Sequence, residues 1–116
     1  MKTQNQRNQS LVDCQRNMRR TQAAIDAVAG KMKDLEKKEA AFQEFKKRIG
    51  GYFDEYLHVH AGTSELKKLD HMKTELHEQT VKINKGHNDE RTSLKAEQKR
   101  LYSQEEEYRR KYRAIT

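Results

Sequence analysis

The histidines and the single cysteine are the residues of this sequence with the most direct capacity for metal binding or catalysis. His58 and His60 lie two residues apart and His71 and His77 lie six apart, so on a helix each pair points to different faces and chelates one ion poorly. Cys14 has no second cysteine with which to form a disulfide within the chain. It also falls in an apolar pattern, where a buried thiol behaves as a small, unreactive hydrophobe. We therefore expect no metal, no cofactor and no enzymatic activity.

The segment Tyr108-Arg109-Arg110-Lys111-Tyr112-Arg113 combines basic and aromatic side chains, as nucleic-acid-binding surfaces do. The chain has a formal net charge of +7 and a pI near 9.5, which fits a nucleic acid or an acidic protein partner. Elsewhere the basic residues alternate with acidic ones, as in residues 31–39. That alternation is typical of coiled-coil flanks that select a helical partner. Nucleic-acid binding is therefore the secondary hypothesis.

The composition predicts helices rather than a thick globular core. Only 33% of the residues are hydrophobic and 37% are charged, against about 45–50% and 25% in ordinary domains. Glu, Lys, Arg, Gln and Ala, all good helix formers, dominate the 116 residues, and there is no proline to interrupt them. Such a polar chain could also be disordered, so the spacing of its apolar residues has to decide.

Apolar residues in the first half recur every three and four positions, with polar residues between them. Sustained heptads of this kind predict a coiled-coil helix and argue against disorder. Ser10 and Asp13 resemble a capping box at the start of that helix, with an extension of the helix further back into the polar start as the alternative. The predicted seam consists of Leu11, Cys14, Met18, Thr21, Ile25, Val28, Met32, Leu35, Glu39, Phe42, Lys46, Ile49, Phe53, Tyr56 and His60.

The second half carries two apolar series that are three residues out of phase. The first contains Leu69, Leu76 and Ile83, and the second contains Leu94, Leu101, Tyr108 and Ile115, preceded by Leu66. Residues 84–93 between them are almost devoid of apolar side chains. We predict a second helix with a weak polar segment there, either a hinge or a short break.

These patterns predict an all-α fold, a long antiparallel two-helix hairpin of the coiled-coil type. We expect a polar N-terminal tail at residues 1–9, a first helix at 10–60, a turn at 61–63 and a second helix at 64–115. A bend of the first helix is expected at Gly50-Gly51, because glycine destabilises a helix interior. Two arms of similar length support this placement of the turn.

Two helices bury only one narrow seam, whereas the aromatic residues near the turn and the C-terminus widen the apolar surface. Small two-helix units usually gain stability by oligomerising, so we expect a four-helix bundle with a helical partner. The predicted partner-binding residues are Ile25, Val28, Met32, Leu35, Phe42, Phe45, Ile49, Tyr52, Phe53, Tyr56, Leu57, Leu69, Leu76, Ile83, Leu94, Leu101, Tyr108 and Tyr112. The asymmetry between the two arms favours a hetero-oligomer over a homodimer.

No apolar run approaches the roughly 20 residues that span a membrane. Residues 1–9 are too polar for a secretory signal peptide. We therefore expect a cytoplasmic protein without a membrane span.

Three segments resemble the LXG-toxin-associated α-helical proteins of Gram-positive type VII secretion, which are small WXG-like helical hairpins. They are Phe42-Gln43-Glu44-Phe45, the central Ile49-Gly50-Gly51-Tyr52-Phe53-Asp54-Glu55-Tyr56-Leu57, and the tail Tyr108-Arg109-Arg110-Lys111-Tyr112. The resemblance covers most of the chain but is largely one of architecture. The chain departs from the WXG-type proteins because it has no Trp-x-Gly; Gly50-Gly51-Tyr52 occupies the comparable region.

The resemblance implies a non-catalytic adaptor or chaperone in a bacterial cytoplasm. Such a targeting factor binds the helical LXG domain of a secreted toxin, together with a sister small helical protein, and presents the toxin to the secretion system. Co-export with that cargo is open. A stalk or escort protein of flagellar or type III export is an alternative that predicts the same fold.

Overall fold

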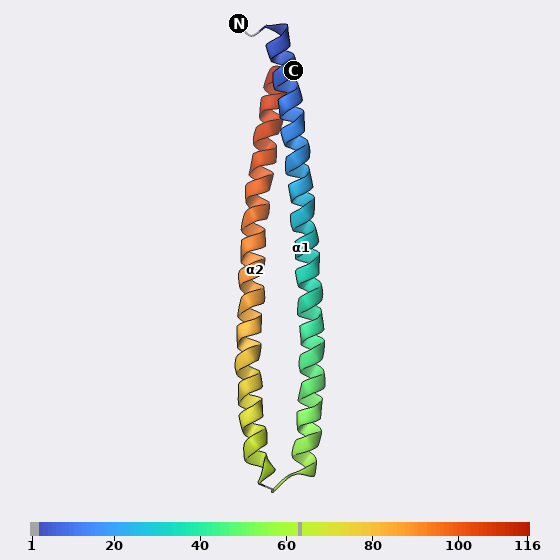
Figure 1. The fold of residues 1–116 in the computed structure, drawn as a ribbon, viewed down its shortest axis with the longest axis vertical. Helices are drawn as coiled ribbons and strands as arrows, with labels where there is room; N and C mark the ends of the chain where they lie inside the picture. The colour runs from blue at the N-terminus through green and yellow to red at the C-terminus, as the bar shows by residue number, and fades with distance from the viewer. Residues whose placement is uncertain (1–2, 63) are drawn as a thin grey trace. The chain divides into compact units, whose positions relative to one another are not determined.

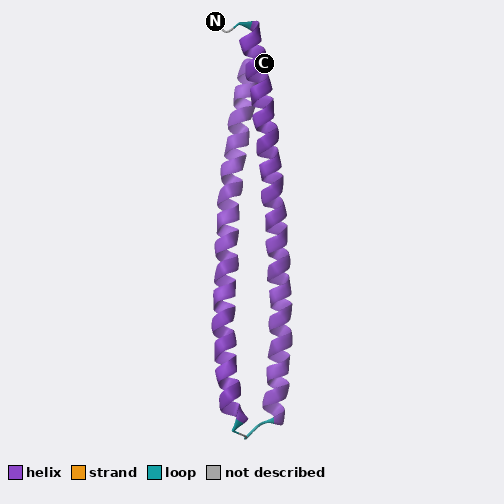
Figure 2. Cartoon of the chain, in the orientation of Figure 1, coloured by secondary structure: helices purple, strands orange, loops and turns teal. Residues whose placement is uncertain are grey.

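The structure, a computed structural model, describes residues 3–62 and 64–116 and folds them into two long α-helices (Figures 1 and 2). Helix α1 is Gln4–Val59 and helix α2 is Glu65–Ile115. No strand is present in the described part of the chain. The predicted all-α, antiparallel two-helix hairpin is therefore confirmed.

The chain divides into two units, which we name by the chain parts they contain. The terminal unit comprises residues 1–33 and 92–116, and the turn unit comprises residues 34–91. In each unit a segment of α1 packs beside a segment of α2. The Cys14 thiol donates to the Tyr108 carbonyl oxygen at 3.1 Å in the terminal unit, and Glu39 pairs with Arg91 in the turn unit.

Helix α1 begins at Gln4, so the expected polar tail at residues 1–9 is wrong for residues 4–9. The physical reason is a capping box upstream of the predicted one. The Gln6 amide N–H donates to Thr3 Oγ1 at 3.2 Å, and the Thr3 amide N–H donates to Gln6 Oε1 at 2.8 Å. These reciprocal bonds satisfy two amides at the helix start, and the polar residues that follow are compatible with a solvated helix.

Helix α1 continues through Gly50 and Gly51 without interruption and ends at Val59. Half-buried Ile49 and Phe53 pack on either side of the two glycines, which offsets their poor helix propensity. The turn contains Gly62, whose φ of 81° lies in the left-handed region that glycine occupies without strain. The expected turn at 61–63 includes residue 63, which lies outside the described residues.

The seam of α1 follows the predicted heptads until it approaches the turn. There Tyr56, which was predicted to lie on the seam, is exposed, and Leu57 is half-buried in its place. Two successive steps of four residues, from Ile49 to Phe53 and on to Leu57, shift the buried stripe around the helix. The local phase change leaves the Tyr56 ring on the flank of the seam.

Helix α2 runs through residues 84–93 without a break, and its inward face connects the two out-of-phase apolar series. Its inward positions follow one another in alternating steps of three and four, except for two successive steps of four that end at Thr80 and Asn84. This is a stutter, a local insertion of four residues into the heptad pattern. The inward positions are Leu66, Leu69, Lys73, Leu76, Thr80, Asn84, His87, Arg91, Leu94, Gln98, Leu101, Glu105, Tyr108, Tyr112 and Ile115.

Two glycines offer a test of these backbone assignments. A Cβ added at helical Gly86 meets nothing within 4 Å, so Gly86→Ala should raise the free energy of unfolding by about 0.5–1 kcal/mol. Gly62→Ala should lower it by about 1 kcal/mol, because alanine is strained at positive φ. Chemical denaturation followed by circular dichroism measures both; a shift of both variants in the same direction would contradict the assignment of helix and turn.

Candidate protein-interaction surface

The fully buried side chains are concentrated in the terminal unit. Among the described residues, that unit buries Cys14, Thr21, Ile25, Val28, Leu94 and Leu101, whereas the turn unit buries Leu35 and Leu69. Small and aliphatic side chains in a seam can be buried by the two helices alone, without a further protein. The turn unit therefore contributes fewer buried side chains, although it contains half of the chain.

The exposed large apolar side chains show the opposite distribution. The turn unit exposes Phe45, Tyr52, Tyr56, Val59, Met72, Val81 and Ile83, and the terminal unit exposes Val12 and Tyr102. Single exposed apolar residues are normal on a protein surface, but a group of them on one surface indicates an interaction site. The turn unit is thus the part of this chain with unsatisfied apolar surface.

The predicted partner-binding residues fall into three groups in the structure. Those buried between α1 and α2 are Ile25, Val28, Leu35, Leu69, Leu94 and Leu101. Those half-buried along the same seam are Met32, Phe42, Ile49, Phe53, Leu57, Leu76, Tyr108 and Tyr112. Those that remain exposed are Phe45, Tyr52, Tyr56 and Ile83. Leu35, at 1% exposure, belongs to the hairpin's own core.

Two adjoining grooves between α1 and α2 form one apolar face in the turn unit. One groove is lined by Tyr52, Phe53, Tyr56, Glu65, Lys68, Leu69 and Met72. The next is lined by Ile49, Phe53, Met72, Glu75, Leu76, Glu78 and Gln79. Phe53 and Met72 belong to both, so the two grooves are continuous. We call this surface the turn-unit apolar face; Phe45 extends it, because it lies seven residues before Tyr52 on the same side of α1.

The other edge of the seam in the turn unit is more polar. Its groove is lined by Lys46, Gly50, Phe53, Lys73, Leu76, His77, Thr80, Val81 and Asn84. Lysine, histidine and asparagine there favour contact with water over contact with an apolar helix. The groove also includes exposed Val81 together with Phe53 and Leu76, so this edge combines polar side chains with apolar surface.

Met72 is the residue of the apolar face that the heptad analysis missed. It is 54% exposed and lies beside the seam, three residues after Leu69. The prediction for this part of α2 followed the series Leu69, Leu76 and Ile83 and included no residue on its flank. An apolar residue immediately next to a seam position is the signal that identifies such a flank.

Phe42 is the centre of a cluster of rings and charges in the turn unit. Its ring stacks with Phe45 at 6.4 Å between centroids, and the His87 ring meets it edge-on at 6.1 Å. The Lys46 ammonium lies 5.8 Å from the ring centroid, within cation–π range. Two polar residues of the seam, Lys46 and His87, are therefore accommodated by contact with an aromatic ring.

An ion pair between Glu39 and Arg91 occupies the seam at the start of the turn unit. Their side chains are 29% and 31% exposed, so both are partly removed from water. Arg91 also receives support from Asn88, whose Oδ1 accepts a bond from its guanidinium at 2.9 Å. The heptad pattern placed Glu39 on the seam but did not indicate its partner. The available signal was that Arg91 lies three residues before Leu94, in phase with the second apolar series.

Two further histidines contact a residue four positions away in the sequence. His71 lies 3.1 Å from Glu75, and the His60 ring stacks on Tyr56 with a centroid distance of 4.0 Å. Across residues 3–62 and 64–116, no group of three or more His, Cys, Asp or Glu residues could hold a metal ion.

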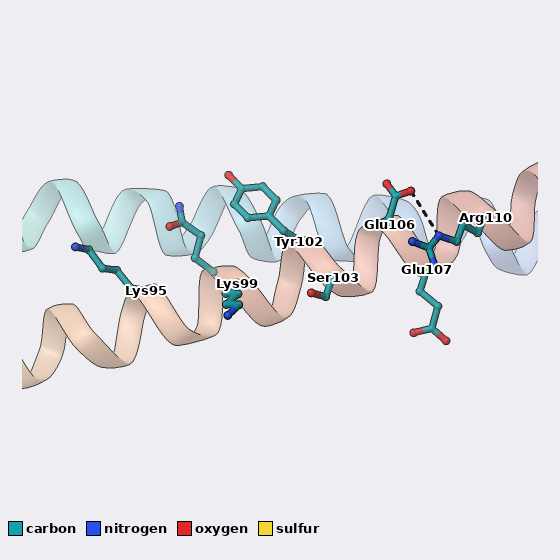
Figure 3. A pocket seen from close by; sticks show the side chains of 8 residues that line it. Lys95, Lys99, Tyr102, Ser103, Glu106, Glu107 and Arg110 are labelled. Carbon is teal, nitrogen blue, oxygen red and sulfur yellow. Dashed lines mark ion pairs between the residues drawn. The ribbon is translucent and has the colours of Figure 1, made fainter.

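The basic and aromatic tail is largely paired within α2. Arg109, Arg110 and Lys111 lie 2.7, 3.7 and 3.5 Å from the carboxylates of the glutamates four residues earlier, and Figure 3 shows the Glu106–Arg110 pair. Tyr108 and Tyr112 are half-buried on the inward face. Three of the tail's charges are thus opposed locally, and its tyrosines pack inside the hairpin.

No helix in the described residues is both long and apolar enough to cross a membrane. No family, curated protein or solved structure matches the chain in the comparisons of sequence and fold.

The Glu39–Arg91 pair yields a stability prediction. Changing both residues to leucine should raise the free energy of unfolding by about 1 kcal/mol, because apolar seam residues often replace a partly buried pair favourably. Either single leucine variant should lower it by about 1–3 kcal/mol, because one charge is left in the seam without its partner. Chemical denaturation of the four proteins in this double-mutant cycle measures the coupling; additive effects would show that the pair does not interact.

Proposed function

We propose that this chain is a non-catalytic binding protein that docks helices of another protein on its turn-unit apolar face. The observation that carries the proposal is the concentration of exposed apolar side chains there, with Tyr52 at 66% and Met72 at 54% exposure beside a continuous groove. Apolar surface removed from water contributes roughly 25 cal/mol per Å². Rings and a methionine beside a groove are the residue types that usually anchor protein interfaces.

The exposed surface of the whole chain supports the need for a partner. The described chain exposes 9206 Å², whereas a compact monomer of 13.8 kDa exposes roughly 6600 Å². Two helices packed along one seam leave their outer flanks in water. Two further amphipathic helices on the apolar face would complete a four-helix bundle and bury those flanks.

The unequal apolar flanks of the two helices, with Phe45, Tyr52 and Tyr56 exposed on α1 and Met72 on α2, favour a different protein over a second copy of this chain. The turn unit has a formal net charge near zero, so its net charge opposes neither kind of partner. The rims of the apolar face carry both signs, with Glu65 and Glu75 acidic and Lys68 basic. Alternating rim charges of this kind select the register and orientation of a helical partner.

The specific partner expected from the family resemblance is the helical LXG domain of a secreted toxin, bound together with a sister helical protein. In that role the chain would act as an adaptor that presents the toxin to a type VII secretion system. The turn-unit apolar face is compatible with such a partner, since it accepts helices. This role remains a prediction and extends the proposed helix binding by naming its partner.

Substitution of two exposed residues tests the docking face. Tyr52→Asp combined with Met72→Asp should abolish co-purification with the natural helical partner, because two carboxylates would be desolvated in the interface. The matched control is Val12→Asp combined with Tyr102→Asp, two apolar residues of similar exposure in the terminal unit. The control should retain the partner, and both double variants should keep the wild-type helical signal in circular dichroism.

The outcomes separate the proposal from its rivals. Loss of the partner in both double variants, or retention in both, would refute the turn-unit apolar face as the docking site. Mass measurement of the purified chain by light scattering distinguishes a heteromeric partner from a second copy. A stable homodimer that dissociates in Tyr52→Asp/Met72→Asp would assign the face to self-association instead.

A further inference from the structure

The net positive charge of this chain comes from the terminal unit. That unit contains 14 lysines and arginines against 6 aspartates and glutamates, a formal net charge of +8. The turn unit contains 11 against 12, a net charge of −1. The net charge of +7 for the whole chain therefore describes neither unit. A polyanion would be attracted to the terminal unit and not to the turn unit.

The type of basic residue is segregated as well. Eight of the ten arginines lie in the terminal unit, and of the two in the turn unit Arg91 is already paired with Glu39. Arginine presents a planar fork of donors that matches two oxygens of a phosphate, whereas lysine acts as a point charge.

The carboxylates of the terminal unit are mostly occupied by neighbours. Asp13 and Asp26 accept bonds from the side-chain amides of the glutamines four residues earlier, at 3.0 and 3.1 Å. Glu105, Glu106 and Glu107 pair with Arg109, Arg110 and Lys111. Asp13 and Asp26 keep their charge, but among the described residues of this unit the ion pairs engage Arg109, Arg110 and Lys111 and none of Arg16, Arg19, Arg20, Lys95 and Lys99.

Two groups of exposed basic side chains result, one on each helix. Arg16, Arg19 and Arg20 lie within about one turn of α1, and Lys95 and Lys99 lie one turn apart on α2. Figure 3 shows Lys95, Lys99 and Tyr102 along the same stretch of α2, and the Tyr102 side chain is 52% exposed. A base stacked on an exposed tyrosine would add to phosphate contacts made by its basic neighbours.

We propose that the terminal unit binds nucleic acid through its phosphate backbone, with Arg16, Arg19, Arg20, Lys95 and Lys99 as principal contacts. A membrane surface fits less well, because membrane-binding helices carry a broad apolar face. Val12 and Tyr102 are the large hydrophobic side chains that the described part of this unit exposes. Binding is sequence-independent, since phosphate contacts carry no base information.

This site differs from the one that the sequence alone indicated. The tail from Tyr108 to Arg113 is basic and aromatic in sequence. In the structure, however, its tyrosines pack inward and three of its cations pair with glutamates. The arginines of α1 lie far from the tail in sequence and precede a stretch rich in alanine. Burial and pairing, rather than local composition, identify the cations that are open to a ligand.

The test measures the full chain binding to a fluorescein-labelled mixed-sequence DNA duplex and to the corresponding single strand by fluorescence anisotropy, over a salt series. Arg16→Gln/Arg19→Gln/Arg20→Gln should weaken binding at least about tenfold at low salt and reduce the salt slope by up to about three. Glutamine keeps good helix propensity, and circular dichroism checks that the fold is retained.

The matched control removes the same charge from the turn unit. Lys37→Gln/Lys47→Gln/Lys67→Gln changes three exposed lysines and should alter the affinity less than about twofold, since those charges lie outside the site. Equal weakening by both triple variants would mean that net charge alone governs binding. Absence of binding by the wild-type chain at low salt would also overturn the proposal.

Three further measurements separate phosphate recognition from a general attraction to anions. Arg16→Lys/Arg19→Lys/Arg20→Lys should bind with an affinity between those of the wild type and the glutamine variant. Polyglutamate and vesicles of phosphatidylserine with phosphatidylcholine should bind at least about tenfold more weakly than DNA under the same conditions. Wild-type affinity in the lysine variant, or preferential binding to either alternative probe, would refute the nucleic-acid site.

Discussion

The limited area that two helices can bury against each other governs this structure. A pair of helices shares one stripe of a and d positions, so most positions on each helix face water whatever their sequence. The composition matches that limit, with 37% charged and 33% hydrophobic residues. Apolar residues beyond the needs of the stripe must lie on its flanks. The location of these additional apolar residues therefore indicates where the chain can bind other helices.

The two units use their share of the stripe differently. In the terminal unit, Ile25, Val28, Leu94 and Leu101 are buried and make the seam largely apolar. In the turn unit, half-buried polar residues occupy much of the seam: Glu39, Lys46, Lys73, Thr80, Asn84, His87 and Arg91. Polar residues in a seam lower stability but restrict the register in which two helices pair. The turn unit thus combines a polar seam with apolar flanks, an arrangement that leaves packing surface for other helices.

The sequence was sufficient to predict the helical hairpin, because heptads depend on local spacing and the chain has few helix breakers. It was insufficient in two ways. The capping box of Thr3 and Gln6, which starts helix α1 early, is a local pattern that the apolar spacing does not reveal. The Glu39–Arg91 pair joins residues far apart in the sequence, which spacing within one helix cannot match. The heptad pattern also identified seam residues such as Leu35 as partner-binding residues. A seam that faces its own hairpin is buried by it, so the candidate interface lies on flanking residues such as Met72, which periodicity alone does not select.

Apolar excess and basic excess occur in different units, and this separation has a physical rationale. An apolar docking face works best where no excess of one sign of charge opposes a partner, and the turn unit has a formal net charge of −1. A phosphate-binding surface works best where carboxylates are engaged elsewhere, as Asp13, Asp26 and Glu105–Glu107 are in the terminal unit. If both surfaces lay on one unit, binding at each would be weaker. Cations would have to be desolvated beside the apolar groove, and apolar side chains would occupy positions that basic residues need for phosphate contacts. Segregation along the chain lets each surface be changed by substitution without altering the chemistry of the other.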